Sequence, residues 1–242
     1  MGKRRPSWAA PPPGEVQDKS RGPRKEPGPR FTNTSPWLLQ HPNLPKPMHG
    51  LNPRTLLGQE WWDVKRRAAY AERDFHCWAC GVHKRDAQVY QWLEGHEEYR
   101  IDYTAGRMEF VRVVALCHFC HSFIHSGRLM ALHEKGEITS GRFKKVIVHG
   151  LDVLHEAGAL PWAETVRVAL LVADARGWRG YKGWPIKRLA KLHVAAKKVD
   201  QTPAKIAAWG KWRLVIEGSD FKPLHKDMDA WRRAYDVFPG DE

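Results

Sequence analysis

Two pairs of cysteines constrain this chain more than any other feature. Cys77 and Cys80 form one pair and Cys117 and Cys120 the other, and the 242 residues contain no further cysteine. Four thiolates in two such pairs are a common ligand set for a closed, tetrahedral structural zinc site. We therefore expect a structural Zn²⁺, with free or redox-active thiols as the alternative. The gap between the pairs is longer than in a simple zinc ribbon, so a folded segment is expected between them.

The sequence predicts a reducing environment for these cysteines. The first 30 residues are basic and proline-rich and lack the apolar stretch of a secretory signal. No apolar run approaches the roughly 20 residues that a membrane span needs. We expect an intracellular, cytoplasmic protein without a membrane partner, in which paired cysteines bind metal rather than form disulfides.

The charge of the chain favours a polyanionic partner. Forty Lys and Arg residues stand against 27 Asp and Glu, which gives a formal net charge of +13. Most of the excess lies in residues 1–30 and 187–213. Basic surfaces of this kind commonly neutralise phosphates, so we expect a nucleic acid as the partner, with DNA and RNA both open. The alternative is that the charge serves solubility alone.

Composition divides the chain into three regions. Residues 1–50 hold most of the 17 prolines and many basic residues, which predicts a disordered Pro/Arg/Lys-rich arm. Residues 51–135 contain the cysteines and should form a zinc-stapled domain with a leading helix. Residues 136–242 read as a helical, basic, Trp-rich accessory region, which is also a candidate for binding a protein partner. The fold class expected is α+β.

The expected elements begin with a helix capped by Asn52 and ending near residue 74. Its apolar face should contain Leu57, Trp61, Val64 and Ala68. Two strands should follow, over residues 88–96 and 108–116, with a turn at Gly106. A helix should come after Cys120, and others over residues 141–157, 161–175 and 227–235. A short strand is expected over residues 212–216.

Three histidines fall where strand, strand and helix would bring them together. His121 and His125 are four residues apart, so on a helix they share a face and can reach one metal ion. They directly follow the second cysteine pair, and His96 lies on the first predicted strand. A zinc ribbon in which these histidines have no ligand role is the structural alternative.

The element Leu116-Cys117-x-x-Cys120-His121-x-x-x-His125 resembles the HNH-type nucleases of the ββα-metal group, in the subset stapled by two CxxC pairs. The resemblance covers about residues 77–127. It implies that the four cysteines hold structural zinc and that His121 and His125 bind a catalytic Mg²⁺, Mn²⁺, Ni²⁺ or Zn²⁺. His96 would be the general base of a phosphodiester hydrolysis on DNA. The character of the remaining chain suggests a phage-encoded protein.

Two positions differ from the family pattern. The family usually has Asp-His or His-His on the first strand, where this chain has Gly95-His96-Glu97. Either His96 is the base and Glu94 or Glu97 the carboxylate ligand, or His96 is the ligand and Glu97 the base. Glu94 and His96 share a face of the strand, which favours that pair. No Asn occurs after residue 52, and Arg112 stands near the position of the family's Asn.

The basic residues expected to contact nucleic acid are Arg112, Lys187, Arg188, Lys191, Lys197, Lys198, Lys211 and Arg213. Trp209, Trp212 and Trp231 lie among them and are expected to be mainly core. The expected activity is metal-dependent endonuclease. The alternatives are a non-catalytic zinc-dependent nucleic-acid-binding protein and an interaction protein built on an inactive HNH fold.

Overall fold

The chain folds as an α+β protein around a four-stranded sheet. The computed structural model describes residues 30–41, 44–159, 188, 191–193 and 205–235. The strands are β1 Glu94–Asp102, β2 Arg107–Leu116, β3 Arg213–Ile216 and β4 Ser219–Phe221, in the order β1-β2-β3-β4. The β1–β2 and β3–β4 pairs are antiparallel, and β2 and β3 are parallel.

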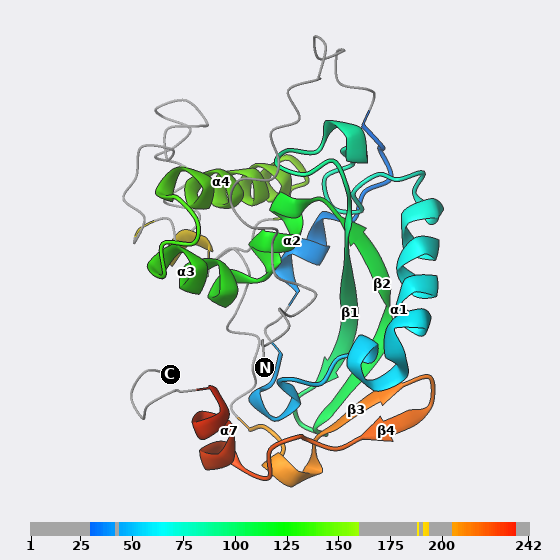
Figure 1. Ribbon diagram of the computed structural model, residues 1–242, viewed down its shortest axis with the longest axis vertical. Coiled ribbons are helices and arrows are strands. Elements are labelled where there is room, and N and C mark those ends of the chain that lie inside the picture. Colours follow the sequence, from blue (N-terminus) through cyan, green and yellow to red (C-terminus); the bar gives the residue numbers. More distant parts are fainter. Residues whose placement is uncertain (1–29, 42–43, 160–187, 189–190, 194–204, 236–242) are drawn as a thin grey trace, which may run out of the picture.

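Helices lie on both sides of the β1–β2 hairpin. They are η1 Pro36–Gln40, η2 Lys46–Met48, α1 Pro53–Glu72, η3 Lys84–Asp86, α2 His118–Ile124, α3 Ser126–Glu134, α4 Ser140–Glu156, η6 Trp209–Lys211 and α7 Met228–Tyr235. In Figure 1, α1 runs beside β2, whereas α2, α3 and α4 group on the other side of the hairpin. None of the helices in the described part of the chain is long and apolar enough to cross a membrane.

Helix α1 begins where the sequence predicts, but its buried face is displaced. The side-chain oxygen of Asn52 accepts the backbone N–H three residues on, at 2.9 Å, and caps the helix. Gly58 has a φ of 91°, so the first turn is offset from the rest of the helix. Beyond this kink Trp62 and Ala69 are buried, whereas Val64 is 65% exposed. Ala68 is exposed as well. The prediction that Val64 and Ala68 lie on the buried face is therefore wrong, because the periodicity was continued through a break at Gly58.

The hairpin agrees with the second predicted strand better than with the first. Strand β2 begins within one residue of the prediction, and Gly106 turns the chain with a φ of 74°, a conformation that favours glycine. Strand β1 begins only at Glu94, so residues 88–93 form a loop. Val89 in this loop has a φ of 75°, which is incompatible with a strand.

The predicted helix after the second cysteine pair is two helices. Helix α2 ends at Ile124, and α3 starts at Ser126. His125 between them has φ −87° and ψ 61°, outside the helical region. Helix α4 follows as predicted, with Phe143 and Leu151 among its buried residues.

The N-terminal part of the folded region belongs to the core. Leu38 and Leu39 of η1 pack in the same cluster as residues of α2 and α4, and Met48 of η2 joins a second cluster under the sheet. Wherever the structure describes it, the segment from residue 30 to residue 50 is folded, so the predicted arm is shorter than residues 1–50. The described prolines are compatible with this fold, because Pro36 begins η1 and because Pro45 and Pro47 are the N-cap and second residue of η2, where a missing N–H costs little.

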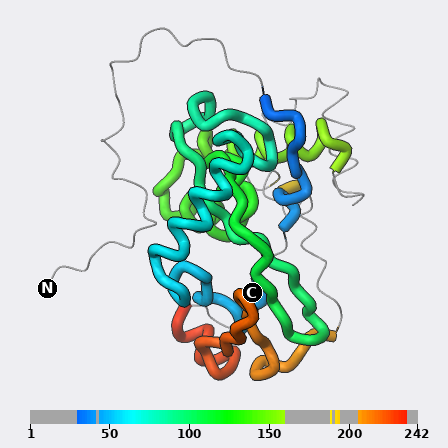
Figure 2. The backbone as a smooth tube through the Cα atoms, turned by 90° about the vertical axis from the view of Figure 1, so that its right-hand side faces the viewer, coloured from blue at the N-terminus to red at the C-terminus, as the bar shows by residue number. Residues whose placement is uncertain are grey.

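Part of the C-terminal region completes the sheet. Trp212, Leu214 and Ile216 pack against Met108 of β2 and Met48 of η2. Figure 2 shows the orange and red C-terminal segment beside the light blue segment of η2 and the start of α1. The described part of residues 136–242 is therefore packed together with residues 51–135 rather than separate from it.

The tryptophan prediction is confirmed at two positions. Trp212 and Trp231 are buried, and Trp231 lies on α7, which matches the predicted closing helix. Trp209 is only half-buried, and its indole N–H donates to the backbone carbonyl of His225 at 2.6 Å. The predicted helix over 161–175 lies outside the described residues, as do Lys187, Lys197 and Lys198.

Candidate metal centres

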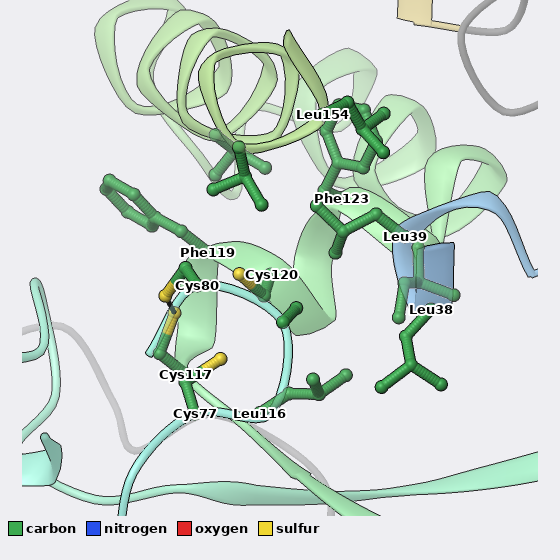
Figure 3. Close-up of a cluster of buried hydrophobic side chains, with 14 of the residues drawn as sticks. Leu38, Leu39, Cys77, Cys80, Leu116, Cys117, Phe119, Cys120, Phe123 and Leu154 are labelled. Atoms are coloured by element: carbon green, nitrogen blue, oxygen red, sulfur yellow. Dashed lines mark hydrogen bonds between the residues drawn. The ribbon is translucent and has the colours of Figure 1, made fainter. Parts of the chain in front are cut away.

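The four cysteines come together as one buried cluster. Their sulfur atoms all lie within 4.8 Å of one another, and all four residues are buried. Figure 3 shows the sulfurs of Cys77, Cys80, Cys117 and Cys120 gathered around a shared space at the start of α2. The thiols are free rather than paired in disulfides.

The dimensions of this cluster fit a tetrahedral metal site. The sulfurs of Cys80 and Cys117 are 3.8 Å apart, close to the roughly 3.8 Å that follows from Zn–S bonds of about 2.3 Å in a tetrahedron. Burial raises the pKa of the Cys120 thiol, so a thiolate there needs a cation beside it. The cluster can hold a structural metal such as zinc.

Local backbone geometry explains how the first cysteine pair forms its turn. The backbone N–H of Gly81 donates to the carbonyl of Cys77 at 2.9 Å, and Gly81 has a φ of 69°. A Cβ at Gly81 would lie 2.3 Å from the carbonyl oxygen of Phe31. Only glycine fits this turn, which also attaches the segment before η1 to the cysteine cluster.

One residue near the cysteines was not predicted from the sequence. The Nε2 atom of His149 on α4 lies 3.3 Å from the sulfur of Cys120 and 3.9 Å from that of Cys117. A thiolate can only accept, so Nε2 must carry the proton when the cysteines bind metal. His149 has no spacing relation to the cysteines, and only the packing of α4 on α2 brings it there.

The second cluster consists of the three histidines singled out in the sequence. One nitrogen from each of His96, His121 and His125 lies within 4.8 Å of the others. The ring centroid of His96 is 5.5 Å from that of His121 and 5.0 Å from that of His125. The centroids of His121 and His125 are 4.7 Å apart. His96 is 4% exposed, and the other two are partly exposed. The three residues could hold one metal ion.

Strand register explains why His96 faces the helix. His96 pairs with Val114, which belongs to the core shared with α2, and paired residues in an antiparallel sheet point to the same face. His121 lies in α2 itself, and His125 is the residue directly after the end of α2. The break at His125 does not separate the two rings, because the backbone N–H of His125 still bonds the carbonyl of His121, at 3.4 Å.

Glu94 lies beside this cluster and orients it. One carboxylate oxygen is 2.5 Å from Nδ1 of His121, and the other is 2.7 Å from Nδ1 of His118. Burial alone would raise the pKa of Glu94, but the two imidazole hydrogen bonds outweigh it and hold this pKa well below its usual range. An ionised carboxylate accepts, so Nδ1 of His121 donates and its Nε2 keeps the lone pair that a metal needs.

His118 and Arg142 extend this network, and neither was assigned to the site from the sequence. The guanidinium Nη2 of Arg142 lies 2.8 Å from Nε2 of His118. Arginine only donates, so Nε2 of His118 accepts and its Nδ1–H is directed at Glu94. His118 is thereby held by a cation on one side and an anion on the other.

Glu97 lies apart from the three histidines. It pairs with Val113, which packs against Trp62 of α1, so its Cβ points to the α1 face of the sheet. Burial raises the pKa of Glu97, against the opposing charges of His121 and Arg54. Strand β1 is an edge strand of the sheet.

His41 approaches the cluster from the segment before α1. Its ring centroid is 5.7 Å from that of His96. The backbone N–H of Tyr99, beside the irregularity in β1, donates to Nε2 of His41 at 3.1 Å. This contact fixes the edge strand to the N-terminal segment, and no pattern in the sequence indicated it.

The predicted nucleic-acid contacts that the structure describes have differing surroundings. Arg112 forms a 2.6 Å ion pair with Glu98, and its guanidinium lies 4.7 Å from the Trp78 ring. Lys211 and Arg213 lie by β3, at the end of the sheet away from the cysteines (Figure 1). Arg188 and Lys191 are exposed.

A scan against protein-family models found no match, and searches of curated proteins and of solved structures found none either. What the two clusters do must therefore be inferred from their own residues.

Proposed function

We propose that this protein is a metal-dependent endonuclease of the HNH, ββα-metal type that hydrolyses phosphodiester bonds in DNA. The observation that carries the proposal is the convergence of His96, from β1, with His121 and His125, at the end of α2. Three neutral imidazoles around one point are a suitable ligand set for a divalent transition metal. His121 and His125 are partly exposed, whereas His96 is buried.

The surrounding architecture supports the same proposal. The order β1, β2, α2 places a strand histidine opposite a helix, and the cysteine cluster fixes the start of that helix. This is the arrangement that the resemblance to zinc-stapled HNH nucleases predicts. A structural ion at the cysteines would hold α2 in place while the histidines carry out the chemistry.

The roles of the residues follow from their contacts. A bound divalent ion would act as a Lewis acid, stabilising charge on the phosphate and on the leaving 3′ oxygen. His96, His121 and His125 would hold it, and Glu94 keeps His121 in the tautomer that can bind. Of the two alignments left open by the sequence, this favours His96 as ligand rather than base.

Glu97 is then the candidate proton acceptor. Its raised pKa brings a carboxyl closer to neutrality, where a general base is most effective. Glu97 directly follows His96 on the edge strand β1, and His121 is close enough to act on its charge. If it is the base, Glu97→Gln slows cleavage without weakening metal binding. If Glu97 is instead a ligand, the same change weakens metal binding.

The direct test is plasmid nicking in the presence of Mg²⁺, Mn²⁺ or Ni²⁺. We expect cleavage by the wild-type chain, and a loss of about 100-fold or more in His96→Ala and His125→Ala. His155→Ala is the matched control, because His155 is an exposed histidine on α4 outside both clusters. Equal cleavage by His125→Ala and the control would contradict the proposal.

A second candidate is a non-catalytic zinc-dependent nucleic-acid-binding protein. The observation that favours it is Arg112, which stands near the position of the family's Asn and is engaged with Glu98. Salt-dependent DNA binding without nicking by any of the three metals would support this candidate instead.

A further inference from the structure

The loop before β1 displays a stacked pair of aromatic side chains. The rings of Tyr90 and Trp92 lie 4.3 Å apart with an angle of 14° between their planes. Trp92 is 44% exposed. One face of its indole is covered by Tyr90, so the exposed area includes the other face. We refer to these two side chains as the aromatic platform.

The backbone that carries the platform is strained. Val89 has a φ of 75°, and a β-branched residue rarely adopts this left-handed conformation. Its side chain is itself 46% exposed, so burial of Val89 does not explain the strain. Strain of this kind concentrates where a loop must present particular side chains. Here the strained residue, Val89, comes directly before the segment that carries Tyr90 and Trp92.

The platform is linked to the histidine cluster indirectly, through His118 and Glu94. The Tyr90 ring packs edge-on against His118 at 4.7 Å, and His118 bonds the carboxylate that orients His121. Arg142 lies over the Tyr90 ring at 5.6 Å and is 3.4 Å from its hydroxyl. Within the described part of the chain no carboxylate pairs with Arg142, so its charge is available to an anion.

We infer that the exposed face of Trp92 stacks on an unpaired nucleobase of the strand whose phosphate lies at the three histidines, with Arg142 neutralising a neighbouring phosphate. This inference rests on the proposed function, since it takes the histidine cluster as the place of the scissile phosphate. A flat indole face can stack on the face of a base, and a cation beside it can neutralise a phosphate of the nucleic-acid backbone. In a duplex the base faces are covered by their neighbours, so the platform selects single-stranded or gapped DNA.

The test is fluorescence anisotropy with labelled single-stranded and duplex oligonucleotides of the same sequence, without added divalent metal. We expect Trp92→Ala to weaken single-strand binding about 10-fold and duplex binding less than 2-fold. Trp92→Phe should keep most of the affinity, whereas Trp92→Leu, which still covers Tyr90, should lose it. Trp37→Ala is the matched control, because Trp37 on η1 is 59% exposed and lies outside the platform.

Nicking by the same variants separates this inference from the proposed function. If the wild-type chain does not cleave but Trp92→Ala still loses single-strand affinity, the platform stands and the endonuclease proposal fails. If the wild-type chain cleaves and Trp92→Ala binds both oligonucleotides as the wild type does, the platform is overturned alone. Equal losses on single strand and duplex also overturn it. Zinc content and melting temperature of each variant show whether it is folded.

Discussion

The cysteine cluster and the histidine cluster share helix α2 but differ in their surroundings. Cys117 and Cys120 flank the first turn of α2 and are enclosed by the main core, together with Phe119 and Phe123. His121 and His125 lie toward its other end and are partly exposed. Structural metal sites are closed, whereas catalytic sites keep a position open. The burial of the ligands, complete at the cysteines and partial at the histidines, therefore distinguishes the expected roles of the two clusters.

The largest expected effect comes from removing the metal of the cysteine cluster. Structural zinc contributes on the order of 10 kcal/mol in small zinc domains, which is comparable to the whole stability of a domain. We expect Cys117→Ser, or zinc stripping by a strong chelator, to unfold the region around α2. Circular dichroism and metal analysis before and after chelation measure this. A chain that keeps its melting temperature after losing all zinc would contradict a structural role for the site.

Removal of one of the three histidines should affect metal binding strongly and stability little. His125→Ala is expected to abolish binding of a second equivalent of Mn²⁺ or Ni²⁺, because two imidazoles hold such an ion far less tightly than three. The free energy of unfolding should change by no more than about 1 kcal/mol, because His125 is partly exposed. Calorimetric titration of the zinc-loaded chain, paired with a thermal melt, separates the two readouts. Unfolding of His125→Ala would show that the histidines, too, are structural.

Substitution of Glu94 tests whether this carboxylate orients the histidine cluster for metal binding. Glu94→Gln keeps an acceptor but removes the charge that fixes Nδ1–H of His121. We expect a 10- to 100-fold loss of affinity for the second metal, the usual effect of losing a carboxylate behind a histidine ligand. Zinc content should be unchanged.

The matched control for Glu94 is Glu98→Gln on the same strand. Glu98 pairs with Arg112 rather than with a histidine, so its loss should leave metal affinity unaltered. Equal affinities in both variants would mean that Glu94 does not orient the cluster.

Local spacing predicted both clusters, and long-range packing decided what surrounds them. The cysteines lie in two short motifs, and His121 and His125 are four residues apart, so chain geometry alone brings most ligands together. The strand and helix with clear periodicity, β2 and α4, were likewise predicted within a residue or two. The convergence of His96 with the helix required one further assumption, that the two strands pair.

What the sequence did not indicate depends on single backbone conformations or distant contacts. The kink at Gly58 displaced the buried face of α1, and the positive φ of Val89 excludes the predicted start of the first strand, which begins only at Glu94. The contacts of Arg142 with His118 and of His41 with Tyr99 join segments far apart in the sequence. No periodicity or motif in the sequence indicates either contact, because only the packing of the whole fold brings these segments together.

The smallest expected effect concerns His149, whose imidazole lies beside the cysteine cluster. Its Nε2–H lies 3.3 Å from the sulfur of Cys120 and partly offsets the negative charge of four thiolates on one divalent ion. We expect His149→Ala to lower zinc affinity about 10-fold, with His149→Gln recovering part of it through the amide N–H. Competition with a chromogenic chelator measures this, with His155→Ala on the same helix as the control. Affinity for the second metal should not change in any of these variants. If His149→Ala weakens both metals equally, the two clusters respond as one unit through α2 and are not independent sites.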